Sequence, residues 1–142
     1  MISLSSLVII LTILISACSP AKSQAGSHEL KMAPMSMLPE EMQSAPVSVR
    51  ESYQFAQANP DVLKQIPCYC GCGSMGHTSN YSCYIQGEQG GETQFDAHAL
   101  GCGICVDITQ DSMRMLKEGK TIAEIRAAVD AKYVQYGPSN MP

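Results

Sequence analysis

The stretch from Pro67 to Gly101 is the part of this sequence that most restricts how the chain can fold. It contains seven glycines and no convincing helical or strand periodicity, apart from a potential strand between Tyr81 and Gln86. Irregular loops longer than about fifteen residues are uncommon in compact domains, so something other than hydrophobic packing must hold this one. Four of its residues are cysteines, and two more follow directly after it. We therefore expect thiol chemistry to order the loop.

The six cysteines form a C-x-C-x-C triplet, a single cysteine and a C-x-x-C pair, namely Cys68, Cys70, Cys72, Cys83, Cys102 and Cys105. The triplet is unsuited to internal pairing, because a disulfide between residues two apart closes a small strained ring. In an extended or turning segment, alternate side chains can instead point to one side. The pair falls on one face at the start of a predicted helix, where the partial positive charge favours thiolates. The spacing thus predicts that six sulfurs meet in one small volume.

Such a volume of thiols favours a soft metal ion. A structural zinc needs only four ligands and usually draws on C-x-x-C pairs, whereas this chain has six thiols and one such pair. The excess indicates bridging sulfurs, and thiolates favour Cu(I) over hard cations, so zinc is the less favoured metal. Two nearby histidines are further candidate ligands or supporting groups. The predicted metal-binding set is therefore Cys68, Cys70, Cys72, Cys83, Cys102, Cys105, His77 and His98.

The N-terminus has the features of a bacterial lipoprotein. Leu7–Ile15 is almost unbroken apolar sequence, and Ile15-Ser16-Ala17-Cys18 is similar to a lipobox, in which the cysteine is acylated and becomes the mature N-terminus. The apolar run is too short for a membrane span, which takes about 20 residues. We expect a signal peptide over residues 1–17, lipid on Cys18, and an extracytoplasmic protein held to the cell membrane or outer membrane by that lipid.

Residues 18–47 are predicted to be the lipidated N-terminus and a flexible linker, followed by a cysteine-rich domain over 48–142. Pro34, Pro39 and Pro46 argue against a continuous helix in the linker. The linker also carries thioether side chains, which suit Cu(I) and could collect it with low affinity: Met32, Met35, Met37 and Met42.

The charge pattern argues against nucleic acid as a partner. The chain has a net charge of −4, and its lysines and arginines are scattered without a basic cluster. The partners that the sequence predicts are a membrane, through the lipid on Cys18, and a metal ion. It identifies no protein partner. The leading hypothesis is a copper-binding lipoprotein that sequesters or delivers the metal and is not an enzyme.

Two other chemistries use the same cysteines. An even number of cysteines in an exported chain is typical of disulfides, and each of three bridges would stabilise a small domain by about 2–4 kcal/mol. Alternatively, Cys102 and Cys105 would cycle between dithiol and disulfide in thiol–disulfide exchange with a partner protein. Sequence reasoning leaves the metal, structural-disulfide and redox hypotheses open.

Helical patterns flank the irregular loop. They predict a first helix from Ser48 to Asn59, a short second helix that Pro67 stops, and two further helices over 103–118 and 122–135. Ser48 with Glu51, and Thr121 with Glu124, match the capping box of a helix start. The predicted fold class is mostly α: a small cysteine-rich domain of three to four helices with a long Gly/Cys-rich loop, after a disordered tether.

The string Pro67-Cys68-Tyr69-Cys70-Gly71-Cys72 resembles the signature of a family of bacterial lipoproteins named after it, the PCYCGC-motif proteins. The resemblance extends to Gly76-His77, to Cys83 and to the segment Cys102–Asp107. It implies a lipoprotein topology and a shared cysteine framework.

Overall fold

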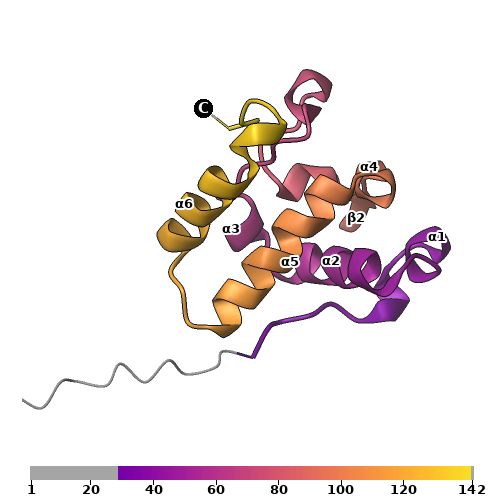
Figure 1. Cartoon of the computed structure of the whole chain (residues 1–142). Helices are drawn as coiled ribbons and strands as arrows, with labels where there is room; N and C mark the ends of the chain where they lie inside the picture. Colours follow the sequence, from indigo (N-terminus) through magenta and orange to yellow (C-terminus); the bar gives the residue numbers. More distant parts are fainter. Residues whose placement is uncertain (1–28, 142) are drawn as a thin grey trace, which may run out of the picture.

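Three long helices form the framework of the computed structural model, which describes residues 29–141 (Figure 1). They are α2 (Val47–Ala58), α5 (Gly103–Lys117) and α6 (Ile122–Tyr133). Helix α5 packs against both of the others, and the interior is filled by fully buried side chains such as Phe55, Ile108 and Ile125. The prediction of a small, mostly α-helical fold is confirmed. Among the described helices, none combines the length and the apolar character that crossing a membrane requires.

One of the two predicted helix starts is confirmed. The Thr121 side chain accepts a hydrogen bond from the Glu124 N–H, while the Glu124 side chain accepts one from the Thr121 N–H, so the capping box of α6 is complete. The capping box at Ser48 is wrong, because α2 begins one residue earlier, after Pro46. Ser48 therefore lies inside the first turn, where its carbonyl accepts hydrogen bonds from Ser52 Oγ at 2.7 Å and Gln110 Nε2 at 3.0 Å.

The domain begins before Ser48. In the described part of the predicted linker, a 3₁₀ turn η1 (Met35–Met37) and a short helix α1 (Glu40–Gln43) precede α2. Leu38 is 3% exposed and Met42 is 1% exposed, because both side chains belong to the apolar core. The prediction of a flexible linker is therefore wrong for residues 29–47, and Met42 is a core residue rather than an exposed metal donor. The predicted signal peptide, Cys18 and the linker up to residue 28 lie outside the described residues.

The region between α2 and α5 consists of short elements. They are α3 (Pro60–Leu63), η2 (Cys72–Met75), η3 (Tyr81–Cys83), β1 (Ile85–Gln89), β2 (Glu92–Phe95) and α4 (His98–Gly101). The predicted strand over Tyr81–Gln86 is only partly right. Its first half is a 3₁₀ turn, and the strand that follows pairs antiparallel with β2. Gly90 and Gly91 have φ values of 63° and 85°, which suit the tight two-residue turn of this hairpin.

The C-terminal tail returns to the cysteine-rich loop. After α6 and the 3₁₀ turn η4 (Val134–Tyr136), the chain runs beside the segment that carries the PCYCGC string, near the top of Figure 1. The Asn140 N–H donates to the Cys68 carbonyl at 3.0 Å, and the Cys68 N–H donates to Asn140 Oδ1 at 2.7 Å. The C-terminal tail thereby fixes the start of the loop.

Candidate metal centre

All six cysteines in the described residues are free thiols, and their sulfurs form one cluster. Cys68 Sγ lies 3.4 Å from Cys105 Sγ and 3.5 Å from Cys70 Sγ. Cys72 Sγ and Cys83 Sγ are 3.7 Å apart. These separations exceed the roughly 2.05 Å of a disulfide bond and are close to sulfur–sulfur contact. The structure thus brings together the triplet, the single cysteine and the C-x-x-C pair, as the spacing predicted.

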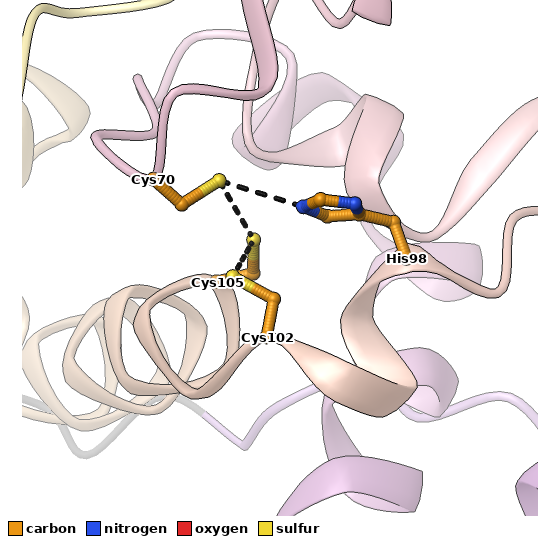
Figure 2. Close-up of side chains that lie close together, drawn as sticks. All are labelled: Cys70, His98, Cys102 and Cys105. Atoms are coloured by element: carbon orange, nitrogen blue, oxygen red, sulfur yellow. Dashed lines mark hydrogen bonds between the residues drawn. The ribbon is translucent and has the colours of Figure 1, made fainter.

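One part of the cluster lies where α4 meets the start of α5, and we call it the outer set. It consists of Cys70, His98, Cys102 and Cys105, whose ligand atoms all lie within 4.8 Å of one another. Cys70 Sγ is 3.5 Å from both His98 Nε2 and Cys105 Sγ, and the sulfurs of Cys102 and Cys105 are 3.0 Å apart. Figure 2 shows these side chains converging from the loop, from α4 and from the first turn of α5. Three of the four are only half-buried.

A second part, the inner set, includes the first residue of the turn η2 and consists of Cys72, Cys83 and His77. Their ligand atoms, together with that of His98, lie within 4.8 Å of one another. Cys72 and His77 are 1% and 8% exposed, and Cys83 is fully buried. The rings of His77 and His98 meet edge to face with centroids 5.0 Å apart. The two predicted histidines therefore lie at the junction between the two sets.

Cys68 connects the two sets. It is fully buried. Its sulfur belongs to one group with Cys70 and Cys72 and to another with Cys83 and Cys105, each within 4.8 Å. Every predicted ligand in the domain is thus in or beside a single connected cluster. Metal binding by these residues stays a prediction, and the geometry identifies the groups of ligands that could share an ion.

A turn at Gly71 separates the members of the triplet. Gly71 has φ of 82°, a left-handed conformation that costs glycine little and other residues more. The chain reverses there, so Cys70 contributes to the outer set and Cys72, the first residue of η2, contributes to the inner set. The triplet therefore converges through a turn. A regular strand would have presented all three sulfurs in a single row.

Two polar residues that sequence reasoning missed hold the site. Asp96 Oδ2 lies 3.5 Å from His77 Nε2, and its Oδ1 accepts the His98 N–H at 2.7 Å. Asn140 Nδ2 donates to Cys72 Sγ at 3.5 Å and to the Ser79 carbonyl at 3.1 Å. Asp96 carried a weak signal, two residues before His98 in a non-periodic segment. Asn140 carried none, because it lies far along the chain from the cysteines it contacts.

The thiols of the cluster differ in acidity. The Cys105 thiol donates to Cys102, which lowers the pKa of Cys102 to about 5, and a hydrogen bond with Cys105 likewise lowers the pKa of Cys68 to about 2. Donation to Cys102 raises the pKa of Cys105 itself. Burial raises the pKa values of Cys70 and Cys72. The metal-free cluster thus holds thiolates beside thiols that must lose protons before they can bind a metal.

The donor set fits a soft, thiophilic metal ion. Four ligands at about 2.3 Å from a tetrahedral metal lie about 3.8 Å apart, and the sulfur separations of 3.4 to 3.7 Å approach that spacing. The pair Cys102–Cys105 at 3.0 Å would have to open slightly. His77 Nδ1 is buried and has no hydrogen-bond partner among the described residues, as expected of a nitrogen whose lone pair is available to a metal. Cysteine and histidine groups that can hold a metal ion are therefore present.

The chain matches, over residues 7–142, the family described as "Protein of unknown function with PCYCGC motif". The match covers the described domain and all of the predicted cysteine and histidine ligands. No curated protein and no solved structure matches the chain.

Proposed function

Because the chain belongs to the family of proteins with a PCYCGC motif, whose function is unknown, we propose its function from the site itself. We propose that it binds Cu(I) through the six-cysteine cluster, with His77 and His98 as further ligands. The observation that carries this proposal is the convergence of six thiol sulfurs and two imidazoles in one connected volume. Thiolate and imidazole are ligands that soft and borderline metals prefer, whereas hard cations prefer oxygen.

The number of sulfurs favours copper over zinc. A zinc ion is satisfied by four ligands, and Cys70, Cys102, Cys105 with His98 already supply a Cys₃His set. That set alone would leave Cys68, Cys72 and Cys83 without a role. Cu(I) bound through bridging thiolates uses all six, and the central position of Cys68 between the two sets supports such bridging. Zinc in the Cys₃His set is the alternative metal that the titration below must distinguish.

The proposed cellular role rests on the N-terminal sequence. We propose that lipid on Cys18 anchors the protein to the outer face of a membrane, where it sequesters copper or delivers it to another protein. Its role is binding rather than catalysis. The proposal is supported by the lipobox-like Ile15-Ser16-Ala17-Cys18 and by the preceding apolar run. Metabolic labelling with a fatty acid tests the anchor: the wild-type chain is expected to be labelled, and Cys18→Ser is not.

Anaerobic titration of the reduced full-length chain with Cu(I) tests the metal. A Cys18→Ser background removes the seventh thiol, so that only the cluster contributes. We expect at least one copper per chain to be retained against a competing Cu(I) chelator, and an excess of Zn(II) not to displace it. Retention of less than one copper per chain, or complete displacement by zinc, would overturn the assignment of Cu(I).

Thiol–disulfide exchange is the second candidate function, and one observation favours it. Cys102 is half-buried at the N-terminus of α5, hydrogen bonding lowers its pKa to about 5, and Cys105 Sγ lies 3.0 Å away. The Cys102 thiolate would attack a partner disulfide and release one partner thiolate. After losing its proton, Cys105 would attack the mixed disulfide and release the second, leaving a Cys102–Cys105 disulfide and a partner reduced by two electrons. The raised pKa of Cys105 slows that second step.

Mass spectrometry of the chain from its native compartment separates the three chemistries. Alkylation without prior reduction is expected to modify the cluster once copper has been removed. Loss of two hydrogens confined to Cys102 and Cys105 would favour exchange. Loss of six hydrogens would mean three structural disulfides and would remove the copper proposal.

A further inference from the structure

We propose that the cluster is two metal sites of unequal accessibility rather than one. The outer site is the set Cys70, Cys102, Cys105 and His98, through which metal enters and leaves. The inner site is the set Cys72, Cys83 and His77, which keeps its bound metal shielded from other donors. This inference rests on the proposed function. It adds that each chain binds two metal ions and that metal exchanges with other molecules through the outer site.

The burial of the ligands divides the cluster. In the inner site, Cys83 is fully buried, Cys72 is 1% exposed and His77 is 8% exposed. In the outer site, Cys70, Cys102 and His98 are half-buried. Only the outer site presents several ligands to an incoming thiolate or thioether donor at once. Metal exchange between proteins needs such simultaneous contact, because a tightly bound soft metal is passed from ligand to ligand.

His77 gives the inner site its own nitrogen ligand. Its Nε2 lies 3.5 Å from the Asp96 carboxylate, and this neighbour favours the tautomer with the proton on Nε2, which leaves a lone pair on Nδ1. That Nδ1 is buried without a hydrogen-bond partner in the described part of the chain, and leaving a buried polar atom unpaired costs free energy. A metal at Cys72 and Cys83 would satisfy it. A carboxylate that orients the ring of a metal-binding histidine in this way is a common feature of metal sites.

The C-terminal tail closes the inner site. Asn140 donates to Cys72 Sγ at 3.5 Å and to the Ser79 carbonyl at 3.1 Å, and its backbone bonds to Cys68. A Cβ on Gly73, in the turn η2, would lie 3.5 Å from the Asn140 side chain, so the tail and the turn are in close approach. These contacts must break before a chelator reaches Cys72 directly. Cys68, 3.4 Å from Cys105 and grouped with Cys72, offers an internal route instead.

The test loads the full-length Cys18→Ser chain anaerobically with two equivalents of Cu(I) and then adds excess bathocuproine disulfonate, which binds Cu(I). We expect two phases of release with equal amplitude, the slow phase at least about tenfold slower than the fast one. Substitution of one ligand in each site identifies the phases. In His77→Gln, the new side-chain amide keeps a polar group beside Asp96 while the Nδ1 ligand is lost. Cys102→Ser is the matched change in the outer site, because Cys102 belongs to that group alone. His77→Gln is expected to remove or accelerate the slow phase, and Cys102→Ser is expected to act on the fast phase.

The outcomes separate this inference from the proposed function. If no copper is retained, the proposed function fails. If one copper is retained, or if two are released in a single phase, copper binding stands and the division into two sites is overturned. Equal effects of His77→Gln and Cys102→Ser on both phases would overturn it as well. The wild-type release curve decides the stoichiometry by itself, so the inference stays testable if a variant does not fold.

Discussion

The helical framework and the cysteine loop of this protein are held by different forces. Helices α2, α5 and α6 bury apolar side chains such as Phe55, Ile108 and Val129 on regular helical faces. The cysteine loop, residues 67–83, has only the 3₁₀ turns η2 and η3 as regular structure. Its interior consists largely of thiols and polar anchors such as Asn80, which donates to the Cys105 carbonyl at 3.2 Å. Hydrophobic packing therefore dominates in the framework, whereas we expect the loop to gain its full stability when a metal binds.

The largest expected effect lies in the framework. Phe55→Ala removes a fully buried ring from α2 and is expected to lower the free energy of unfolding by about 3–5 kcal/mol. Because the ring packs among apolar side chains and is not a metal ligand, the loss should be the same with and without copper. Chemical denaturation of both forms measures it. Val47→Ala, at an exposed position of the same helix, is the control and should change stability by less than about 0.5 kcal/mol. A loss that copper abolishes would contradict the separation of the two regions.

Copper should stabilise the loop more than the framework. At a free Cu(I) concentration about 100 times the dissociation constant, the folded state gains about 2.7 kcal/mol. Hydrogen exchange followed by mass spectrometry should place the added protection in residues 67–83 and in the first turn of α5. Helix α6 serves as the internal control. Protection that increases equally along α6 would mean that the loop is already as stable as the framework without metal.

Asn140→Ala tests the polar anchoring of the loop. The change removes the hydrogen bonds to the Cys68 N–H, the Ser79 carbonyl and Cys72 Sγ and leaves partly buried groups unpaired. We expect a loss of about 2 kcal/mol, accompanied by faster copper release from the slow phase. Val134→Ala, at an exposed position of the turn η4 that precedes the tail, is the control. An Asn140→Ala protein with unchanged stability and unchanged release would show that the tail does not hold the loop.

Copper affinity should rise with pH. Burial raises the pKa values of Cys70 and Cys72, and donation to Cys102 raises that of Cys105, so these thiols are protonated in the metal-free protein at neutral pH. Each proton that copper displaces strengthens binding by about tenfold, or about 1.4 kcal/mol, per pH unit. Competition titrations between about pH 6 and pH 8 measure the slope. A flat profile would show that the ligands are already thiolates.

The smallest expected effect is the loss of a helix cap in the framework. Thr121→Ala breaks the capping box of α6 and is expected to cost about 1 kcal/mol. Ser48→Ala, at the capping box that does not form, should be nearly neutral, because α2 has no side-chain cap. Thermal unfolding of the two variants compares them directly. Equal losses would indicate that Ser48 caps α2 after all.

Features of the framework that depend on residues close in sequence could be predicted, whereas contacts made only by tertiary packing could not. The bounds of α5 and α6 and the cap at Thr121 were predictable because helical periodicity and capping are properties of residues three or four apart. The convergence of the cysteines was predictable from spacing and helix direction. The packing of Leu38 and Met42 onto the core was not, since their short segment has no periodicity of its own and is fixed by the surface that it meets.

The sequence by itself determined that this chain forms a mostly α-helical fold around a cluster of thiols, because periodicity, capping and cysteine spacing act over a few residues. Only the tertiary structure decided which thiol belongs to which set. That assignment depends on the turn at Gly71, on Asp96, which lies beside the His77 ring and accepts the His98 N–H, and on Asn140, which reaches Cys68 and Cys72 from a distant part of the chain. Contacts between distant residues leave no local pattern, since their partners are brought together only when the helices pack.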